Sequence, residues 1–437
     1  MKRTHIKDLK SEVGKEINIK GFVQTIRDQG SIKFLLVRDV TGLIQVVILK
    51  SDQEAFEAAS KLTHESVVSL TGNVKEEAQA PEGFEVQAKK IEILSLADPE
   101  LPIPVVVEKG GEETEMTKRF DWRWIDLRKE SRLRIFKVWD TLEKGFRKVF
   151  EDESFTQIYT PTFMNTASES GADVFEVDYF GKKAYLSQSP QFYKQMAMAS
   201  GFEKVFMTGS VYRAEESFTT RHMTEFTGWD FEMSYVNSDE NVAEILEKLL
   251  VSGLEIVKKD LGKELAGDGV EIEVPSTPFP RITFSEMKET LKKAGVKSDK
   301  EFDFSPEEER ALSEIVKKEK GHEFVFITHY PVEARPFYHM RQDDDPKLTK
   351  SFDLFYRGVE LSTGAQREHR PEILEKQAKE KDMDTESLTN YINFFKYGCP
   401  PHGGAGFGPA RLVMKILGAP SVKEVTFLPR DVKRLTP

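Results

Sequence analysis

The chain has 437 residues, of which 63 are Lys or Arg and 74 are Asp or Glu, so its formal net charge is −11. This length predicts two or three domains, and 39% hydrophobic with 31% charged residues excludes a disordered or membrane-embedded chain. The single cysteine, Cys399, excludes a disulfide framework and a cysteine-rich zinc site. The N-terminus lacks the apolar core of a secretion signal, which favours a cytoplasmic location.

The first hundred residues are predicted to form a small β domain. Ser51 is placed to cap a short amphipathic helix between the third and fourth strands. Five strands with a helix at that point follow the order of an OB-fold, which commonly binds oligonucleotides or oligosaccharides. An unrelated small barrel or sandwich stays open as an alternative. The expected strands are rich in Val, Ile and Phe and cover Glu16–Asp28, Ile32–Asp39, Leu43–Leu49, Ser66–Glu76 and Gly83–Leu94.

Residues 101–130 are expected to be a hinge that follows this domain of residues 1–100. Pro99, Pro102 and Pro104 interrupt regular structure, and residues 109–115 are rich in Gly and Glu. Eight basic residues follow between Lys118 and Lys137. A run of charge is usually a solvated face, but its position at a domain junction leaves contact with a polyanion open as an alternative.

Residues 131–437 are expected to form an antiparallel α+β domain. A long amphipathic helix is predicted from Ser131, because apolar residues recur at three- and four-residue spacing at Ile135, Trp139, Leu142, Phe146 and Val149. Most of the strands follow one another directly, which favours an antiparallel sheet over a doubly wound one. The other expected elements are a β-rich stretch over Phe155–Met233, a helix over Val242–Leu261, strands over Glu323–His329 and Ser351–Glu360, and a helix over Arg411–Leu417.

Three segments of this domain contain groups suited to ATP. The first, Val211–Met233, is predicted as a strand, a polar loop and a strand. An arginine offers a charged fork to a phosphate, a carboxylate accepts a hydrogen bond from the adenine amino group, and an aromatic ring stacks on the base. An edge hairpin with surface ion pairs is the alternative. The groups concerned are Arg213, Glu215, Arg221, His222 and Phe226.

The other two segments are a glycine-rich strand and an acidic strand. Gly403–Leu412 allows close approach to its backbone and places Arg411 at a helix start, but Pro409 occupies the position of the last glycine of the dinucleotide fingerprint. Phe352–Arg370 contains Asp353 and Glu360, hard oxygen ligands suited to Mg²⁺ that also binds phosphates. Each segment alone is more often structural.

Together, the three segments resemble the three-motif core of the class II aminoacyl-tRNA synthetases. The long helix followed by Ser154–Phe163 resembles the first motif, with Pro161 on the dimer-forming strand. An N-terminal OB-fold resembles the subclass that handles aspartate, asparagine and lysine. Gln188–Gln195, Arg221–Phe226 and the ending FLPRDVKRLTP are similar to the aspartyl-tRNA synthetases of the archaeal and eukaryotic type.

This resemblance implies that ATP and Mg²⁺ are used to attach L-aspartate to tRNA through an aspartyl-adenylate, in a homodimer. It implies that Arg213, Glu360 and Arg411 are catalytic. The implied ATP-binding residues are Arg213, Glu215, Arg221, His222, Met223, Phe226, Glu360, Gly408, Pro409, Ala410 and Arg411. The implied aspartate-binding residues are Glu169, Gln191, Lys194, Asp230, Thr363, Gln366 and Arg367. The implied magnesium ligands are Glu360, Thr363 and Asp353.

The resemblance also assigns anticodon contacts to the first domain. Phe34 would stack on the central U and Gln45 would form a hydrogen bond near it. Relatives that charge only tRNA(Asp) typically have Trp and Lys at two positions that hold Gln24 and Pro81 here. We therefore expect tRNA(Asn) to be charged as well, with an amidotransferase as a further partner. Ser170, Ala365 and Ala410 also depart from the family pattern.

Three other functions are alternatives to this one. An asparaginyl-tRNA synthetase of the same subclass usually has Glu where Asp230 stands. A non-catalytic OB-fold RNA-binding protein on a synthetase scaffold would support no pyrophosphate exchange. An asparagine synthetase of the synthetase-like type lacks the OB domain, which the predicted strands of Glu16–Leu94 argue against.

Overall fold

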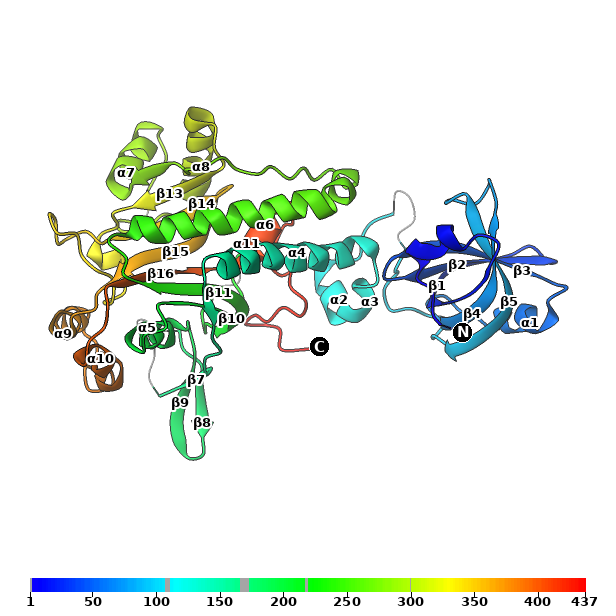
Figure 1. The fold of residues 1–437 in the computed structure, drawn as a ribbon, viewed down its shortest axis with the longest axis horizontal. Coiled ribbons are helices and arrows are strands. Elements are labelled where there is room, and N and C mark those ends of the chain that lie inside the picture. Colours follow the sequence, from blue (N-terminus) through cyan, green and yellow to red (C-terminus); the bar gives the residue numbers. More distant parts are fainter. Residues whose placement is uncertain (1, 107–110, 166–172, 217–218, 299) are drawn as a thin grey trace. The chain divides into compact units, whose positions relative to one another are not determined.

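The computed structural model describes residues 2–106, 111–165, 173–216, 219–298 and 300–437. The chain divides into two compact units, Met1–Lys129 and Glu130–Pro437, which are described one at a time (Figure 1). Within these described ranges, no helix is both long enough and apolar enough to cross a membrane.

A closed barrel forms the first unit, with its strands in the order β1-β2-β3-β5-β4 (Figure 1). The five predicted strands are all present within one residue of their expected ends. Alternating side chains point into the barrel, so Leu35 and Val37 are fully buried whereas Phe34 and Leu36 are partly exposed. The strands are β1 (Glu16–Asp28), β2 (Ile32–Asp39), β3 (Gly42–Leu49), β4 (Val67–Glu76) and β5 (Phe84–Ser95).

The expected helix between the third and fourth strands is also present. Helix α1 spans Gln53–Ala59, and Asp52 occupies its N-cap without a side-chain hydrogen bond. The predicted cap by Ser51 is wrong, because the helix starts two residues beyond that side chain. A short 3-10 helix, η1 (Ile6–Glu12), precedes the barrel and adds two buried apolar side chains to its core.

Two short helices, α2 (Met116–Asp121) and α3 (Arg123–Asp126), contain part of the basic segment. Arg123 is fully buried and pairs with Asp126 at 2.8 Å. Lys129 pairs with Glu113 at 3.0 Å. These cations belong to the interior of the unit, so they do not form the solvated face that the charge run suggested.

An eight-stranded sheet forms the centre of the second unit, in the order β12-β13-β14-β15-β16-β11-β10-β6 (Figure 1). All its neighbours are antiparallel except β12 with β13 and β6 with β10. The expected α+β class is confirmed. The bounds are β6 (Thr156–Gln157), β10 (Lys204–Tyr212), β11 (Glu225–Ser234), β12 (Arg281–Thr283), β13 (Phe324–Thr328), β14 (Ser351–Tyr356), β15 (Val359–Arg367) and β16 (His402–Phe407).

One predicted strand, Ser351–Glu360, is in fact a hairpin. Strands β14 and β15 are joined by Arg357 and Gly358, whose φ angles of 46° and 77° are both positive. Two successive residues with positive φ are typical of the tight turn that joins antiparallel strands. A separate small sheet contains β7 (Phe163–Met164), β9 (Lys182–Leu186) and β8 (Glu176–Tyr179).

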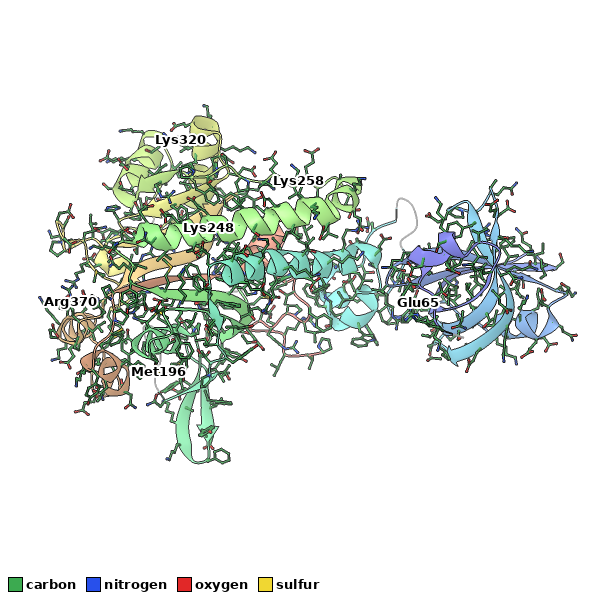
Figure 2. The ribbon with its side chains drawn as sticks, viewed as in Figure 1. Glu65, Met196, Lys248, Lys258, Lys320 and Arg370 are labelled. Carbon is green, nitrogen blue, oxygen red and sulfur yellow. The ribbon has the colours of Figure 1, made fainter. Side chains whose placement is uncertain are left out.

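Two long helices, α4 (Glu130–Asp152) and α6 (Asp239–Gly267), lie side by side over the sheet (Figure 1). They approach closely where Gly145 faces Gly253: a Cβ atom on Gly145 would lie 2.5 Å from the Gly253 Cα. Lys248 and Lys258 lie on the exposed side of α6 (Figure 2). Helix α4 starts one residue before its predicted start at Ser131. Helix α6 is longer than the predicted Val242–Leu261 at both ends.

Several helices were not predicted. Helices α7 and α8 start with capping boxes formed by Thr283 with Glu286 and by Ser305 with Glu308, a pattern that is readable in the sequence. Helix α5 interrupts the stretch that was expected to be β-rich. The remaining elements are α5 (Gln191–Ala199), α7 (Phe284–Lys293), α8 (Pro306–Lys320), η2 (Val332–Ala334), α9 (Pro371–Glu380), α10 (Thr389–Lys396) and α11 (Pro409–Ile416).

Candidate active site

A cleft of about 420 Å³ opens on the second unit. Its lining comes from α5, the β10–β11 hairpin, β15, β16, the start of α11 and the loop around residues 335–339. Most of the sequence-predicted site residues meet here. They are Gln191, Lys194, Arg213, Glu215, Arg221, His222, Met223, Phe226, Asp230, Glu360, Thr363, Arg367, Gly408, Ala410 and Arg411.

The register of the sheet brings distant parts of the chain together in this cleft. Asp230 on β11 and Thr363 on β15 both pair with Gly406 on the strand between them. A Cβ atom at Gly406 would lie 3.1 Å from an Asp230 carboxylate oxygen, and one at Gly404 would lie 2.3 Å from Glu232 Oε2. The glycine-rich strand therefore makes room for two carboxylates of the neighbouring strand.

One end of the cleft is rich in arginine. Arg213 lies over the Phe226 ring at 5.5 Å and 3.8 Å from the Glu215 carboxylate. Arg411 donates a hydrogen bond to the Glu360 carbonyl oxygen at 2.8 Å, and Arg221 forms an ion pair with a carboxylate of α8. Three guanidinium groups in one cleft suit a polyphosphate.

His222 belongs to the same cationic end. Its Nδ1 lies 2.7 Å from the Thr219 hydroxyl oxygen. Burial, followed by the charge of Arg411, lowers the pKa of His222 below its ordinary value. The imidazole is therefore neutral near pH 7 and can offer a hydrogen bond there without adding a further charge.

A closed network of charges forms the other end. Lys194 is 1% exposed, and its Nζ lies 2.8 Å from Asp230 Oδ2 and 3.3 Å from Glu232 Oε2. Arg367 is 3% exposed, and its Nε lies 3.0 Å from Glu232 Oε1. Burial opposes ionisation of Glu232, but the charges of Arg367 and Lys194 hold its pKa below the ordinary value. Glu232 is thus one anion shared by two buried cations.

Two neutral histidines surround this network. Arg367 lies 2.8 Å from His339 Nε2, and burial with that positive charge lowers the pKa of His339 well below its ordinary value. His402 lies 2.9 Å from the Gln195 side chain on one side and 2.9 Å from the Pro400 carbonyl on the other. Burial lowers the pKa of His402 to about 4. Both rings are therefore hydrogen-bonding groups that add no charge at pH 7.

Oxygen atoms suited to a cation lie at the wall of the cleft, on Glu360 and Thr363, and directly behind it on Asp353. Thr363 donates a hydrogen bond to Asp353 Oδ1 at 2.7 Å and lies 3.4 Å from Glu360 Oε1. Burial and the negative charge of Asp353 raise the pKa of Glu360. The described residues contain no group of three or more His, Cys, Asp or Glu placed to hold a metal by themselves. The donor set fits Mg²⁺ that is also bound by substrate phosphates.

Four predicted site residues lie elsewhere. Asp353 does not line the cleft: it is buried and pairs with Arg335 at 2.9 Å. Gln366 also lies outside the lining and donates a hydrogen bond to the Val236 carbonyl at 3.3 Å, and its place on the aspartate floor stays a prediction. Pro409 is buried in the first turn of α11. Glu169, like Ser170, lies outside the described residues.

Sequence reasoning missed other residues of the site. Glu232 stands two positions after Asp230 on the same strand, so the two-residue period of a strand could have placed it on the same face. Glu232 lies behind the lining, whereas Arg335, Tyr338 and His339 line the cleft and belong to a loop with no recognisable motif.

The outer surface of the barrel contains the predicted anticodon residues. Phe34 pairs with Val47 and points away from the core, which settles the ambiguous alternation around it. Gln45 donates a hydrogen bond to Glu85 at 2.8 Å, and Gln24 accepts one from Arg38 at 2.8 Å. Pro81 is exposed between β4 and β5.

Comparisons with known proteins agree with both units. The family model described as tRNA synthetases class II (D, K and N) matches residues 115–432, and that of the OB-fold nucleic acid binding domain matches residues 17–94. The aspartate–tRNA(Asp/Asn) ligase of Methanopyrus kandleri is 42% identical over 97% of this chain and 96% of its own. The aspartate–tRNA(Asp) ligase of Pyrococcus abyssi is 41% identical over 100% of both chains.

A solved structure extends the likeness to three dimensions. The asparaginyl-tRNA synthetase of Pyrococcus horikoshii, complexed with asparaginyl-adenylate, matches with a TM-score of 0.91 and 30% identity over 100% of both chains. The match covers the barrel and the sheet that forms the cleft. The chain therefore belongs to the class II tRNA synthetases of the D, K and N group, with an OB-fold nucleic acid binding domain.

Proposed function

We propose that this chain is an aspartate–tRNA ligase that uses ATP to form aspartyl-adenylate and then transfers the aspartyl group to tRNA. The observation that carries the proposal is the pair of buried cations, Lys194 and Arg367. They lie at the opposite end of the cleft from Arg213, Arg221 and Arg411. In this proposal residues 1–100 bind the anticodon, 101–130 form the hinge and 131–437 form the catalytic domain.

The proposed activation step needs no protein nucleophile. An oxygen of the substrate α-carboxylate attacks the α-phosphorus of ATP, and the bond to the departing pyrophosphate breaks. Arg213 binds the α-phosphate, and Arg221 with the neutral His222 binds the terminal phosphates. Charge that develops during the step therefore meets two fixed guanidinium groups and a hydrogen-bonding imidazole. Phe226 and Arg411 enclose the adenine ring, and the Glu215 carboxylate accepts a hydrogen bond from the adenine amino group. The terminal ribose hydroxyl of tRNA then attacks the aspartyl carbonyl and AMP leaves.

Magnesium is part of the proposal. Glu360, Thr363 and Asp353 are the residues that would hold it. When bound, Mg²⁺ supplies charge neutralisation for the phosphates. Burial and the charge of Asp353 raise the pKa of Glu360 although Arg411 lies 3.8 Å from its Oε1, so a further cation would stabilise the ionised carboxylate.

Selection of aspartate over asparagine follows from the charge network. When Asp230 binds the substrate α-amino group, Lys194 and Arg367 retain only Glu232 between them. A substrate carboxylate then supplies the second negative charge, whereas an amide of the same shape leaves one positive charge unpaired. Leaving a buried charge without its partner costs about 3–5 kcal/mol, which is enough for strong discrimination without editing. Gln191 and Asp230 line the same end of the cleft and would contact the rest of the amino acid.

Pyrophosphate exchange tests the amino acid that is activated. The purified chain is expected to exchange labelled pyrophosphate into ATP with aspartate and not with asparagine. Stimulation by asparagine alone would favour an asparaginyl-tRNA synthetase, the function of the solved neighbour. Exchange with neither amino acid would favour a non-catalytic RNA-binding protein.

Charging of tRNA(Asn) as well as tRNA(Asp) is the second part of the proposal. Pro81 has no side-chain donor and Gln24 has its amide oxygen engaged by Arg38, so these two positions offer few contacts that read one anticodon base. Side-by-side aminoacylation of both tRNAs with aspartate, at one stated salt concentration, checks this. Charging of tRNA(Asp) alone contradicts it. If both are charged, an amidotransferase partner is implied.

Two further assignments belong to the proposal. A homodimer is supported by the exposure of Tyr159 and Pro161 in the segment after β6, where a second copy could pack. Light scattering of the purified chain would measure it, and a monomeric mass would contradict it. We also place the enzyme in the cytoplasm, where its tRNA substrates are.

A further inference from the structure

The cationic end of the cleft contains an ion pair that none of the assigned roles uses. Arg221, in the loop between β10 and β11, pairs with the carboxylate of Glu309 in the first turns of α8. Both side chains are largely buried, with 19% and 12% of their surfaces exposed. The two residues are 88 positions apart in the chain, so the tertiary fold alone brings them together.

Helix α8 is held in place by its packing and by its N-terminal cap. Its apolar side packs in a core with α7 and β13 that includes Leu312 and Val316, both almost fully buried. Its first turn is closed by the capping box of Ser305 and Glu308. Glu309 follows directly in the helix, and its side chain reaches Arg221 from outside the lining of the cleft.

The carboxylate of Glu309 is poorly compensated. Burial raises its pKa to about 7, and the negative charge of Glu360 on β15 adds to the rise, while Arg221 and Arg411 oppose it. Lys415 on α11 also faces it, and burial lowers the pKa of that lysine. When a more highly charged anion replaces such a carboxylate, the electrostatic stabilisation of the paired arginine increases.

We propose that Glu309 holds Arg221 in the ATP-free enzyme and competes with the terminal phosphates of ATP for its guanidinium. This inference rests on the proposed function, because Arg221 is the group assigned there to those phosphates. ATP binding then exchanges the carboxylate for phosphate oxygens, and Glu309 recovers Arg221 when pyrophosphate leaves. Glu309 is thus a positioning residue for ATP entry and pyrophosphate release, since it acts through Arg221.

Titration calorimetry of the full chain tests this with ATP, AMP and pyrophosphate as ligands and Mg²⁺ present. Glu309→Gln keeps the shape of the side chain and removes its charge. We expect ATP and pyrophosphate to bind about 3- to 10-fold more tightly to this variant, because the competing charge is gone. AMP has no terminal phosphates, so its affinity is expected to stay unchanged.

Two control variants separate the competition from a structural effect. Glu309→Asp retains the charge and is expected to return ATP affinity towards that of the unaltered chain. Glu314→Gln removes an exposed charge from the same helix and is expected to change nothing. Thermal unfolding checks that each variant folds, and Glu309→Ala provides a second removal of the charge.

The outcomes are distinct. Unchanged or weaker ATP binding by folded Glu309→Gln overturns the inference, and so does an equal change in AMP affinity. If Glu309→Gln binds ATP and pyrophosphate more tightly with unchanged AMP affinity, and the unaltered chain exchanges pyrophosphate with aspartate, both the inference and the proposed function stand. Normal exchange together with unaltered ATP affinity in the variant overturns the inference alone, whereas no ATP binding by the unaltered chain overturns both.

Discussion

At the scale of single residues, Arg367 is the side chain on which the substrate end of the cleft depends most. Its guanidinium donates to Glu232 at 3.0 Å, to His339 at 2.8 Å and to the Gly404 carbonyl at 2.8 Å. Such divergent bonds need the planar fork of arginine, and an ammonium group on a flexible stem cannot reproduce them. In the proposed function, this fork sets where the substrate carboxylate binds.

Arg367→Lys keeps the charge and removes the fork. We expect kcat/KM for aspartate in pyrophosphate exchange to fall about 100-fold, because two hydrogen bonds to charged or buried groups are lost. Arg370→Lys is the matched control: Arg370 is half exposed and pairs with Glu368, and neither residue lines the cleft. Equal losses in the two variants would contradict the role given to Arg367.

His402 links stability to pH. Its pKa in the folded chain is about 4, below the ordinary 6.5, because burial disfavours the imidazolium. Between these values the unfolded chain binds a proton that the folded chain does not, so the free energy of unfolding falls as pH falls through this window. The loss from this group between pH 7 and pH 5 is about 2 kcal/mol.

His402→Asn removes the titrating group and is expected to remove that part of the loss. Urea unfolding of both chains at pH 7 and pH 5 measures it, as the difference between the two pH-dependent changes in free energy. The same pH-dependent change in the variant and the unaltered chain would show that His402 is not its source.

Only part of this site was predictable from residues. Arg213, Glu360 and Arg411 stand in motifs whose spacing survives in the sequence, and all three line the cleft. Glu232 and Arg335 do not stand in a motif of this kind. Their positions in the site depend on how the strands and the loop pack together. Asp353 was correctly placed near Glu360 and Thr363, but the sequence did not show that Arg335 covers it.

At the scale of elements, the close contact of α4 with α6 depends on two glycines. A Cβ at Gly145 would lie 2.5 Å from the Gly253 Cα, and backbone cannot move aside as a side chain can. Gly145→Ala is therefore expected to lower the free energy of unfolding by about 1–3 kcal/mol through overpacking.

Gly262→Ala in α6 is the matched control. The nearest atom to its added Cβ is Lys258 Cγ at 3.9 Å, an ordinary van der Waals distance, so space is available. Alanine is the better helix former, and this variant is expected to gain roughly 0.5–1 kcal/mol. Denaturant unfolding of both variants gives the comparison. A destabilised Gly262→Ala with a neutral Gly145→Ala would contradict the packing argument.

Elements with strong local patterns were predictable and the others were not. The five barrel strands alternate apolar and polar residues, so their ends were correct to one residue. The hairpin of β14 and β15 was taken as one strand, because its turn contains only Arg357 and Gly358 between two apolar runs. Helix α5 is short, and nothing in its flanks marked it against neighbouring strands.

At the scale of the whole molecule, the two units are expected to have separable tasks. Phe34 lies on the barrel and no assigned step of adenylate formation involves it. Phe34→Ala is therefore expected to lower kcat/KM for tRNA charging roughly 5- to 150-fold, since stacking contributes about 1–3 kcal/mol per base. Pyrophosphate exchange without tRNA is expected to stay unchanged.

Leu94→Ala is the control for this separation, because Leu94 is also a partly exposed apolar residue of the barrel but has no assigned base contact. Aminoacylation and exchange rates of the three chains are the measurements. A fall in exchange caused by Phe34→Ala, or an equal fall in charging caused by Leu94→Ala, would contradict the division of tasks.

The sequence by itself determined the barrel, the α+β class and the motif residues of the ATP end, because alternation and short-range spacing are local properties. Only the tertiary structure decided that Lys194 and Arg367 share Glu232, that Gly404 and Gly406 make room for two carboxylates, and that Glu309 meets Arg221. These contacts join strands and helices far apart in the chain, and their register depends on the packing of the whole sheet.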